Sequence, residues 1–215
     1  GPLGYRPLRE FLVAKLARDA GIRCSADEVL ITSGSLLGLD FVNAALVAPG
    51  DTVIVEQATY GGTLSRLQRL KANIVGVPVD DEGLDCNALS TTLAEMSKRG
   101  VRPKYIYTIP TVQNPTASIM SEGRRTQLLA LSEHYGVPIL EDECYSDVVW
   151  EGKRPPALRA MDSSDRRLDI TCPIEDVKQS HCVKRRIKTA RFERLMDCLD
   201  PVWRRMCQRL HEINR

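Results

Sequence analysis

The chain has 215 residues, a formal net charge of +2 and a hydrophobic fraction of 43%, enough for one sizeable buried core. This balance gives no reason to expect a nucleic-acid partner, and its longest apolar runs are too short to cross a membrane. Seven cysteines without a secretory signal pattern predict reduced thiols in a cytoplasmic protein.

Helices and strands are expected to alternate along most of the sequence. Apolar spacing predicts helices at 7–20, 36–48, 62–71, 86–99 and 121–135, and strands at 29–32, 52–56, 73–78, 105–109 and 137–141. β-branched strands that alternate with helices predict an α/β fold, a three-layer sandwich with a mostly parallel central sheet. Ligands are therefore expected at the carboxyl ends of the strands.

The alternation stops after about residue 150, where a polar, proline-rich connector follows. Helical spacing returns over residues 190–210, and Pro201 predicts a kink there. Residues 1–162 carry a net charge of −3 and residues 163–215 one of +5. We therefore predict one large, incomplete α/β domain over 1–162 and a divergent, basic, helical tail over 163–215. The cysteines and histidines of the tail lack the regular spacing of zinc ligands, so no metal site is expected.

Three groups of polar residues follow predicted strands. The turn Ser33-Gly34-Ser35 opens a helix whose free N–H groups suit a phosphate, although a serine cap without a ligand explains it as well. The loop Gln113-Asn114-Pro115-Thr116 offers a directional amide at Asn114, but it also fits a plain turn. The segment Glu141-Asp142-Glu143-Cys144-Tyr145 puts carboxylates at a strand end, where a solvated acidic loop is the simpler interpretation.

Taken together and in this order, the three motifs resemble the class I/II aminotransferases, which are fold-type-I enzymes dependent on pyridoxal 5'-phosphate (PLP). The likeness is strongest to the 2-aminoadipate and aromatic aminotransferases and spans about residues 4–162. It implies PLP as cofactor, amino-group transfer between an amino acid and a 2-oxo acid, and a homodimer in full-length relatives.

The resemblance also implies a role for each residue that matches. Gly34, Ser35 and the Leu36 amide would hold the cofactor phosphate, and Tyr60 would stack on the pyridine ring. Asn114 and Tyr145 would donate hydrogen bonds to the ring's phenolic oxygen. Asp142 would keep the pyridine nitrogen protonated, so that the ring accepts electrons from the substrate. Glu141 and Glu143 alternate with Asp142 along a strand and are poorer candidates.

The lysine that bonds PLP covalently is not where the family carries it. The family's Ser-x-Ser-Lys stretch, about thirty residues past the tyrosine, has no counterpart in this sequence. Lys178 has nearly the right separation from Tyr145, but its neighbours differ, and chance explains the match more simply. Ala117 also replaces the glycine that commonly follows Asn-Pro-Thr. The alternative to a transaminase is therefore a catalytically inactive fragment of this fold that acts as a binding or dimerisation partner.

Overall fold

A computed structural model of the chain describes residues 1–149, 153–162, 172–173 and 181–184. Lys178 and the helix predicted over 190–210 lie outside the described residues. Where the predicted helical tail is described, it forms two short strands. Among the described residues, no helix is long and apolar enough to cross a membrane.

The described elements alternate as the sequence predicts. The α-helices are α1 (Arg6–Ala20), α2 (Ser35–Leu46), α3 (Gly61–Arg69), α4 (Cys86–Lys98), α5 (Glu122–Tyr135) and α6 (Leu158–Met161). The strands are β1 (Val29–Thr32), β2 (Thr52–Glu56), β3 (Asn73–Val77), β4 (Val79–Asp80), β5 (Gly83–Leu84), β6 (Ile106–Thr108), β7 (Ile139–Glu143), β8 (Cys172–Pro173) and β9 (His181–Lys184). Short 3-10 turns are η1 (Ala26–Glu28) and η2 (Ser146–Val148).

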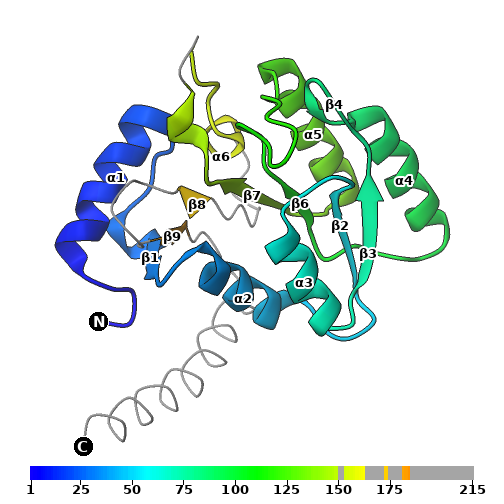
Figure 1. Cartoon of the computed structure of the whole chain (residues 1–215), viewed down its shortest axis with the longest axis horizontal. Helices are drawn as coiled ribbons and strands as arrows, with labels where there is room; N and C mark the ends of the chain where they lie inside the picture. Colours follow the sequence, from blue (N-terminus) through cyan, green and yellow to red (C-terminus); the bar gives the residue numbers. More distant parts are fainter. Residues whose placement is uncertain (150–152, 163–171, 174–180, 185–215) are drawn as a thin grey trace, which may run out of the picture.

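A five-stranded parallel sheet forms the centre, in the order β3-β2-β6-β7-β8. Its strands alternate their side chains between two apolar layers. Ile54, Ile106 and Ile139 pack against α4 and α5 on one face. Val55 and Tyr107, on the other face, pack against α2 and α3. Figure 1 shows these two helical layers on either side of the sheet, which confirms the predicted three-layer α/β sandwich.

Two strands from the end of the described chain connect β7 to β1, and the first of them, β8, is the edge strand of the central sheet. β8 pairs with β7 in parallel, and β9 pairs with β1 in antiparallel register from Val29 with Lys184 to Thr32 with His181. β8 and β9 also contact each other, and Figure 1 shows both between β7 and β1. The amino-terminal unit of α1 and β1 is thereby connected to the sheet edge.

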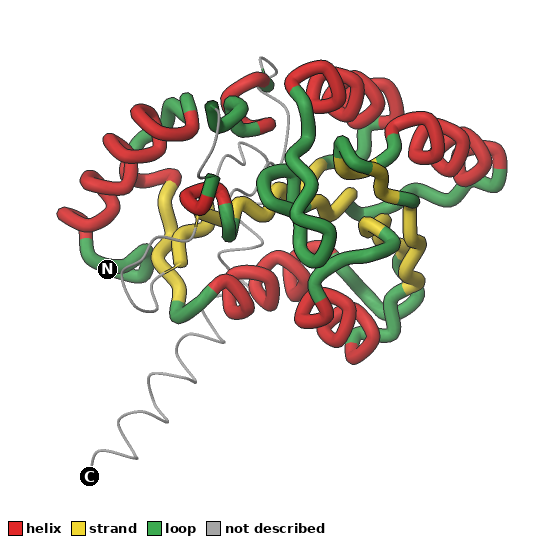
Figure 2. Tube along the Cα trace, turned by 45° about the horizontal axis from the view of Figure 1, so that its top comes forward, coloured by secondary structure: helices red, strands yellow, loops and turns green. Residues whose placement is uncertain are grey.

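Helix α1 lies at the end of the molecule opposite α4, as the tube in Figure 2 shows. Its buried face includes Leu16 and Ala20, which pack with Ala157 at the start of α6. The Ala157 amide donates to the Ala20 carbonyl at 3.3 Å. Gly21 ends α1 with φ 71°, a left-handed conformation in which a side chain would be strained. This packing holds α1 beside the segment that follows β7.

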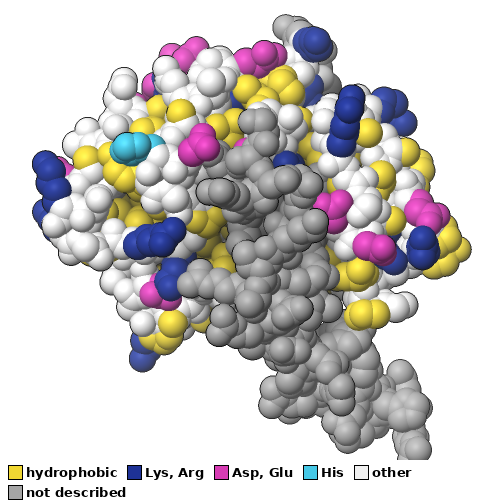
Figure 3. Space-filling view, turned by 180° about the vertical axis from the view of Figure 1, so that it is seen from behind, with side chains coloured by type: hydrophobic (Ala, Val, Ile, Leu, Met, Phe, Trp, Pro, Cys, Tyr) yellow, Lys and Arg dark blue, Asp and Glu magenta, His cyan; other side chains and the backbone are white. Residues whose placement is uncertain are grey.

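The described surface mixes charges of both signs. On the face in Figure 3, basic and acidic side chains are interspersed among neutral and apolar ones in the described part of the chain. Such mixing is the ordinary pattern of a globular surface.

Candidate functional site

The carboxyl ends of β2, β6 and β7 meet at one edge of the sheet because the three strands are parallel. Strand β7 continues two residues further than the sequence predicts, through Asp142 and Glu143. The interpretation of a solvated acidic loop is wrong, since all three carboxylate residues of β7 are at most 3% exposed. A strand with this much buried charge requires a specific partner for each carboxylate.

Asp142 faces the α2 and α3 side of the sheet together with Tyr107 of β6. The Tyr107 hydroxyl, which is fully buried, donates to Asp142 Oδ2 at 2.6 Å. The Cys144 thiol donates to Asp142 Oδ1 at 2.6 Å. Burial, and then the nearby Asp142 carboxylate, raise the pKa of Tyr107 well above its usual value, so the phenol remains a proton donor. Both oxygens of Asp142 are thus held by donors.

The turn at Gly34 opens α2 without a side-chain cap. Gly34 has φ 92°, and the Leu37 and Gly38 amides both donate back to its carbonyl. The amides of Ser35 and Leu36 have no hydrogen-bond partner within the described part of the chain. The starts of α1, α3 and α6 also lack a side-chain cap, whereas α4 and α5 are capped by the Asp85 and Ser121 side chains. An uncapped amino terminus with free N–H groups is suited to an anion.

Tyr60 precedes α3 on the same face of the sheet. Leu36 and Tyr60 both pack against the apolar cluster that contains Tyr107, and Arg66 of α3 donates from Nε to the Leu36 carbonyl at 3.3 Å. A Cβ atom at Gly62 would lie 2.4 Å from Tyr60 Cε1, so the tyrosine ring fits over this turn only because residue 62 is glycine. The starts of α2 and α3 are therefore connected, and both pack against the cluster that contains Tyr107, the residue that donates to Asp142.

Asn114 and Tyr145 are brought together from different loops. Asn114 Nδ2 donates to the Tyr145 hydroxyl at 3.3 Å, and the Tyr145 side chain is 38% exposed. Two residues for which the sequence predicts a shared ligand atom thus lie in contact. Their donation to a ligand stays a prediction.

Ala117 lies in the same loop as Asn114. It has φ 60°, the left-handed conformation that glycine adopts without steric cost. The replacement of the usual glycine therefore places strain in this loop.

No sequence pattern indicated a buried glutamate at the end of β2. Glu56 is fully buried, and its Oε1 accepts hydrogen bonds from the Thr108 hydroxyl at 2.6 Å and the Ile109 amide at 3.1 Å. Its Oε2 accepts from Gln113 Nε2 at 2.8 Å. Burial raises the pKa of Glu56 to about 7, and the neutral donors around it lower the pKa only in part.

The raised pKa of Glu56 makes the free energy of unfolding of the wild type depend on pH. The variant Glu56→Gln should lack this dependence, because glutamine does not titrate. The folded pKa is raised, so the contribution of Glu56 to stability is fully present below its ordinary pKa near 4.5 and is lost as the pH rises to about 7. We expect the stability of the wild type relative to Glu56→Gln to fall by about 3 kcal/mol across that window. Urea unfolding at pH 4.5, 5.5, 6.5 and 7.5 measures it, and two parallel pH profiles would contradict it.

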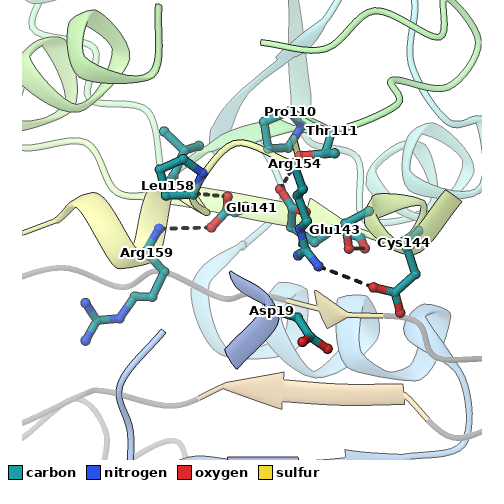
Figure 4. A network of polar contacts seen from close by, with 12 residues as sticks. Asp19, Pro110, Thr111, Glu141, Glu143, Cys144, Arg154, Leu158 and Arg159 are labelled. Carbon is teal, nitrogen blue, oxygen red and sulfur yellow. Dashed lines mark hydrogen bonds and ion pairs between the residues drawn. The ribbon is translucent and has the colours of Figure 1, made fainter. Parts of the chain in front are cut away.

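The opposite side of β7 holds a buried ion network, shown in Figure 4. Glu141 accepts from the Leu158 and Arg159 amides at 2.7 and 3.1 Å. Glu143 accepts from the Thr111 hydroxyl at 2.8 Å and from Arg154 at 3.2 Å. Both carboxylates thus point away from Asp142, as their alternation along the strand predicted. Their role is to join β7 to its neighbours.

Arg125 of α5 lies at the centre of this network and is fully buried. Its Nη1 is 3.7 Å from Glu141 Oε1 and 3.6 Å from Glu143 Oε1. Its Nε and Nη2 donate to the Met120 and Pro110 carbonyls at 2.9 Å. Burial and the neighbouring Glu143 raise the pKa of Glu141, while Arg125 lowers it. The sequence did not single out Arg125, because a helical arginine usually lies on the surface.

These features define a parallel α/β domain with polar side chains and an uncapped helix start near the carboxyl edge of its sheet, the edge at which such folds bind ligands. Residues 2–172 match the family described as aminotransferase class I and II. The chain belongs to this family of fold-type-I, PLP-dependent proteins, which confirms the resemblance seen in the sequence motifs.

Individual relatives agree with this membership. The chain is 35% identical over 163 residues to aromatic-amino-acid aminotransferase 1 of Thermococcus litoralis, a match that covers 76% of this chain and 39% of that protein. It is 34% identical over 155 residues to the 2-aminoadipate transaminase of Thermus thermophilus, covering 72% and 36%. The crystal structure of an archaeal alanine:glyoxylate aminotransferase superposes with a TM-score of 0.85 at 31% identity, covering 94% and 50%. The chain thus spans half or less of the length of these relatives.

Proposed function

We propose that this chain is the cofactor-binding half of an enzyme that transfers an amino group between an amino acid and a 2-oxo acid through PLP, as part of a homodimer. The observation that carries the proposal is Asp142, a buried carboxylate whose two oxygens are held by Tyr107 and Cys144. It lies on the same face of the sheet as the uncapped start of α2. The thiols of Cys86 and Cys144, which act as hydrogen-bond donors, fit a reducing, cytoplasmic setting.

The residues present suit the chemical groups of PLP. The Ser35 and Leu36 amides, with Gly34 before them, suit the phosphate, because the helix dipole favours a negative charge there. Tyr60 offers an aromatic face to the ring. The Asn114–Tyr145 pair offers donors for the phenolic oxygen, and Asp142 is an acceptor for a protonated ring nitrogen.

When bound, PLP supplies the electron acceptor that makes the proton on the substrate's α-carbon removable. Asp142 serves this purpose by holding a proton on the ring nitrogen. Tyr107 and Cys144 keep the Asp142 carboxylate oriented. Catalysis also requires a lysine amine to bond the cofactor and move the substrate proton, and Lys178 is the candidate that the sequence spacing offers.

Fixing the cofactor with borohydride tests both parts of this function. The full chain is treated with PLP and then with borohydride, which makes a link between PLP and a lysine amine permanent, and the modified peptide is identified by mass spectrometry. We expect one modified lysine per chain, lost in Lys178→Ala, retained in the control Lys184→Ala, and suppressed by excess pyridoxamine 5'-phosphate.

Two other outcomes of the borohydride experiment would count against the proposed function. Specific binding of pyridoxamine 5'-phosphate without a modified lysine contradicts catalysis by this chain, and it favours the alternative, an inactive fragment that retains the cofactor site. A chain that binds neither form of the cofactor contradicts the proposed function as a whole.

A further inference from the structure

Gln113 is buried at the carboxyl edge of the sheet and connects two loops. Its Nε2 donates to Glu56 Oε2 at 2.8 Å and to the Ala58 carbonyl at 2.6 Å. Its Oε1 accepts from the Thr116 amide and the Thr116 hydroxyl, both at 2.8 Å. A glutamine amide has two donor hydrogens and two acceptor lone pairs. All four are used, so the side chain is fixed in position and orientation.

The two loops that Gln113 joins carry two of the predicted cofactor contacts. Ala58 lies two residues before Tyr60, the predicted ring-stacking residue. Thr116 lies two residues after Asn114, the predicted donor to the ring oxygen. The amide of one side chain therefore determines how far apart these two contacts lie across the site.

Glu56 determines which way the Gln113 amide faces. A carboxylate only accepts hydrogen bonds, so it selects the NH₂ group of Gln113 and directs the amide oxygen toward Thr116. The other oxygen of Glu56 is held by Thr108 and Ile109 of the next strand. Glu56 thus joins the end of β2 directly to the end of β6, and through Gln113 to the loop that carries Asn114.

We propose that Glu56 and Gln113 are positioning residues that hold Tyr60 and Asn114 at the separation at which ring stacking and the contact to the ring oxygen form together. This inference rests on the proposed function, since it assigns the ligand ring to that site. Neither side chain is required to touch the ligand.

Exchanging the two side chains separates this role from general packing. In Glu56→Gln the amide groups of residues 56 and 113 place donor against donor, and in Gln113→Glu acceptor faces acceptor across a buried contact. The double variant Glu56→Gln/Gln113→Glu restores a donor and an acceptor, and it also preserves both hydrogen bonds from Thr116. It loses the bond to the Ala58 carbonyl, and a carboxylate oxygen of residue 113 faces that carbonyl instead, so its recovery is expected to be partial.

The measurement is calorimetric binding of pyridoxamine 5'-phosphate and of its 3-deoxy analogue, in which hydrogen replaces the ring oxygen, to the full chain at pH 8. The wild type is expected to prefer the natural cofactor at least 10-fold. Each single variant is expected to lose this preference, and the double variant to recover it to within about 3-fold of the wild type. Gln127→Glu on the exposed face of α5 is the matched control and should behave as the wild type.

The outcomes distinguish this inference from the proposed function. A wild type that binds neither compound contradicts the proposed function. A wild type that binds both, with a preference that survives in the single variants or stays lost in the double variant, overturns the positioning role alone. If a single variant fails to fold, Thr116→Val serves in its place, because it removes the hydroxyl bond to Gln113 and keeps the amide bond, although the hydroxyl contacts with Ser118 are lost as well. It should reduce the preference several-fold, and an unchanged preference would overturn the inference.

Discussion

Replacing Asp142 by asparagine is expected to weaken the binding of pyridoxamine 5'-phosphate by roughly 10- to 100-fold, the effect of losing one charge-assisted hydrogen bond. Asparagine has nearly the same shape but no negative charge, so it cannot hold a proton on the ring nitrogen. Its NH₂ group would also face one of the two donors that now hold the carboxylate, Tyr107 or Cys144. Calorimetric titration of the full chain measures the change.

A ligand that lacks the ring nitrogen provides the control for this prediction. The 1-deaza analogue carries a C–H group at that position, so Asp142→Asn should change its affinity far less than that of the natural cofactor. Asp81→Asn, at an exposed position between β4 and β5, should leave both affinities unchanged. Equal losses for the natural and deaza ligands would show that the variant distorts the site and that Asp142 does not contact the nitrogen.

Much of the scaffold follows from local sequence patterns. Hydrophobic spacing and β-branched runs place β2, β6 and their flanking helices to within a few residues, because burial on both faces of a parallel sheet leaves a continuous apolar signal. The turn at Gly34 and the loop at Asn114 are likewise marked by their own residues. The pairing of β1 with β9 could not be foreseen, since it joins segments about 150 residues apart.

The polar part of the site was only half predictable. Asp142, Asn114 and Tyr145 were found because their motifs resemble a family, whereas Glu56, Tyr107 and Arg125 do not stand out in the sequence. Their importance comes from burial and from partners on distant elements, such as Thr108 with Glu56 across 52 residues. For the same reason β7 was predicted to end at residue 141, two residues before its observed end. An acidic strand end is stable in the core only because Glu141 and Glu143 have buried partners on other elements.

Replacing Arg125 by methionine is expected to lower the free energy of unfolding by about 3–5 kcal/mol, because it leaves buried carboxylates without their counter-charge. Methionine fills a similar volume, so the loss reflects charge and hydrogen bonds more than a cavity. Arg125 has no exposed surface and interacts with Glu141, Glu143 and the carbonyls of Met120 and Pro110. Urea unfolding at pH 6 and pH 8 measures the effect.

The neighbouring Arg124 provides a matched control. It pairs with the exposed Asp80 and Glu82, and such surface pairs contribute at most about 1 kcal/mol, so Arg124→Met should lower the free energy of unfolding only slightly.

The pH dependence of the stability gives a second check. Without Arg125 the pKa of Glu141 should rise further above its ordinary value, so Arg125→Met should lose more stability relative to the wild type at pH 8 than at pH 6. Neutralising both carboxylates, in Arg125→Met/Glu141→Gln/Glu143→Gln, should recover part of the loss. The explanation by uncompensated buried charge would be contradicted by either of two results. The triple variant could be no more stable than Arg125→Met, or Arg124→Met could be as destabilising as Arg125→Met.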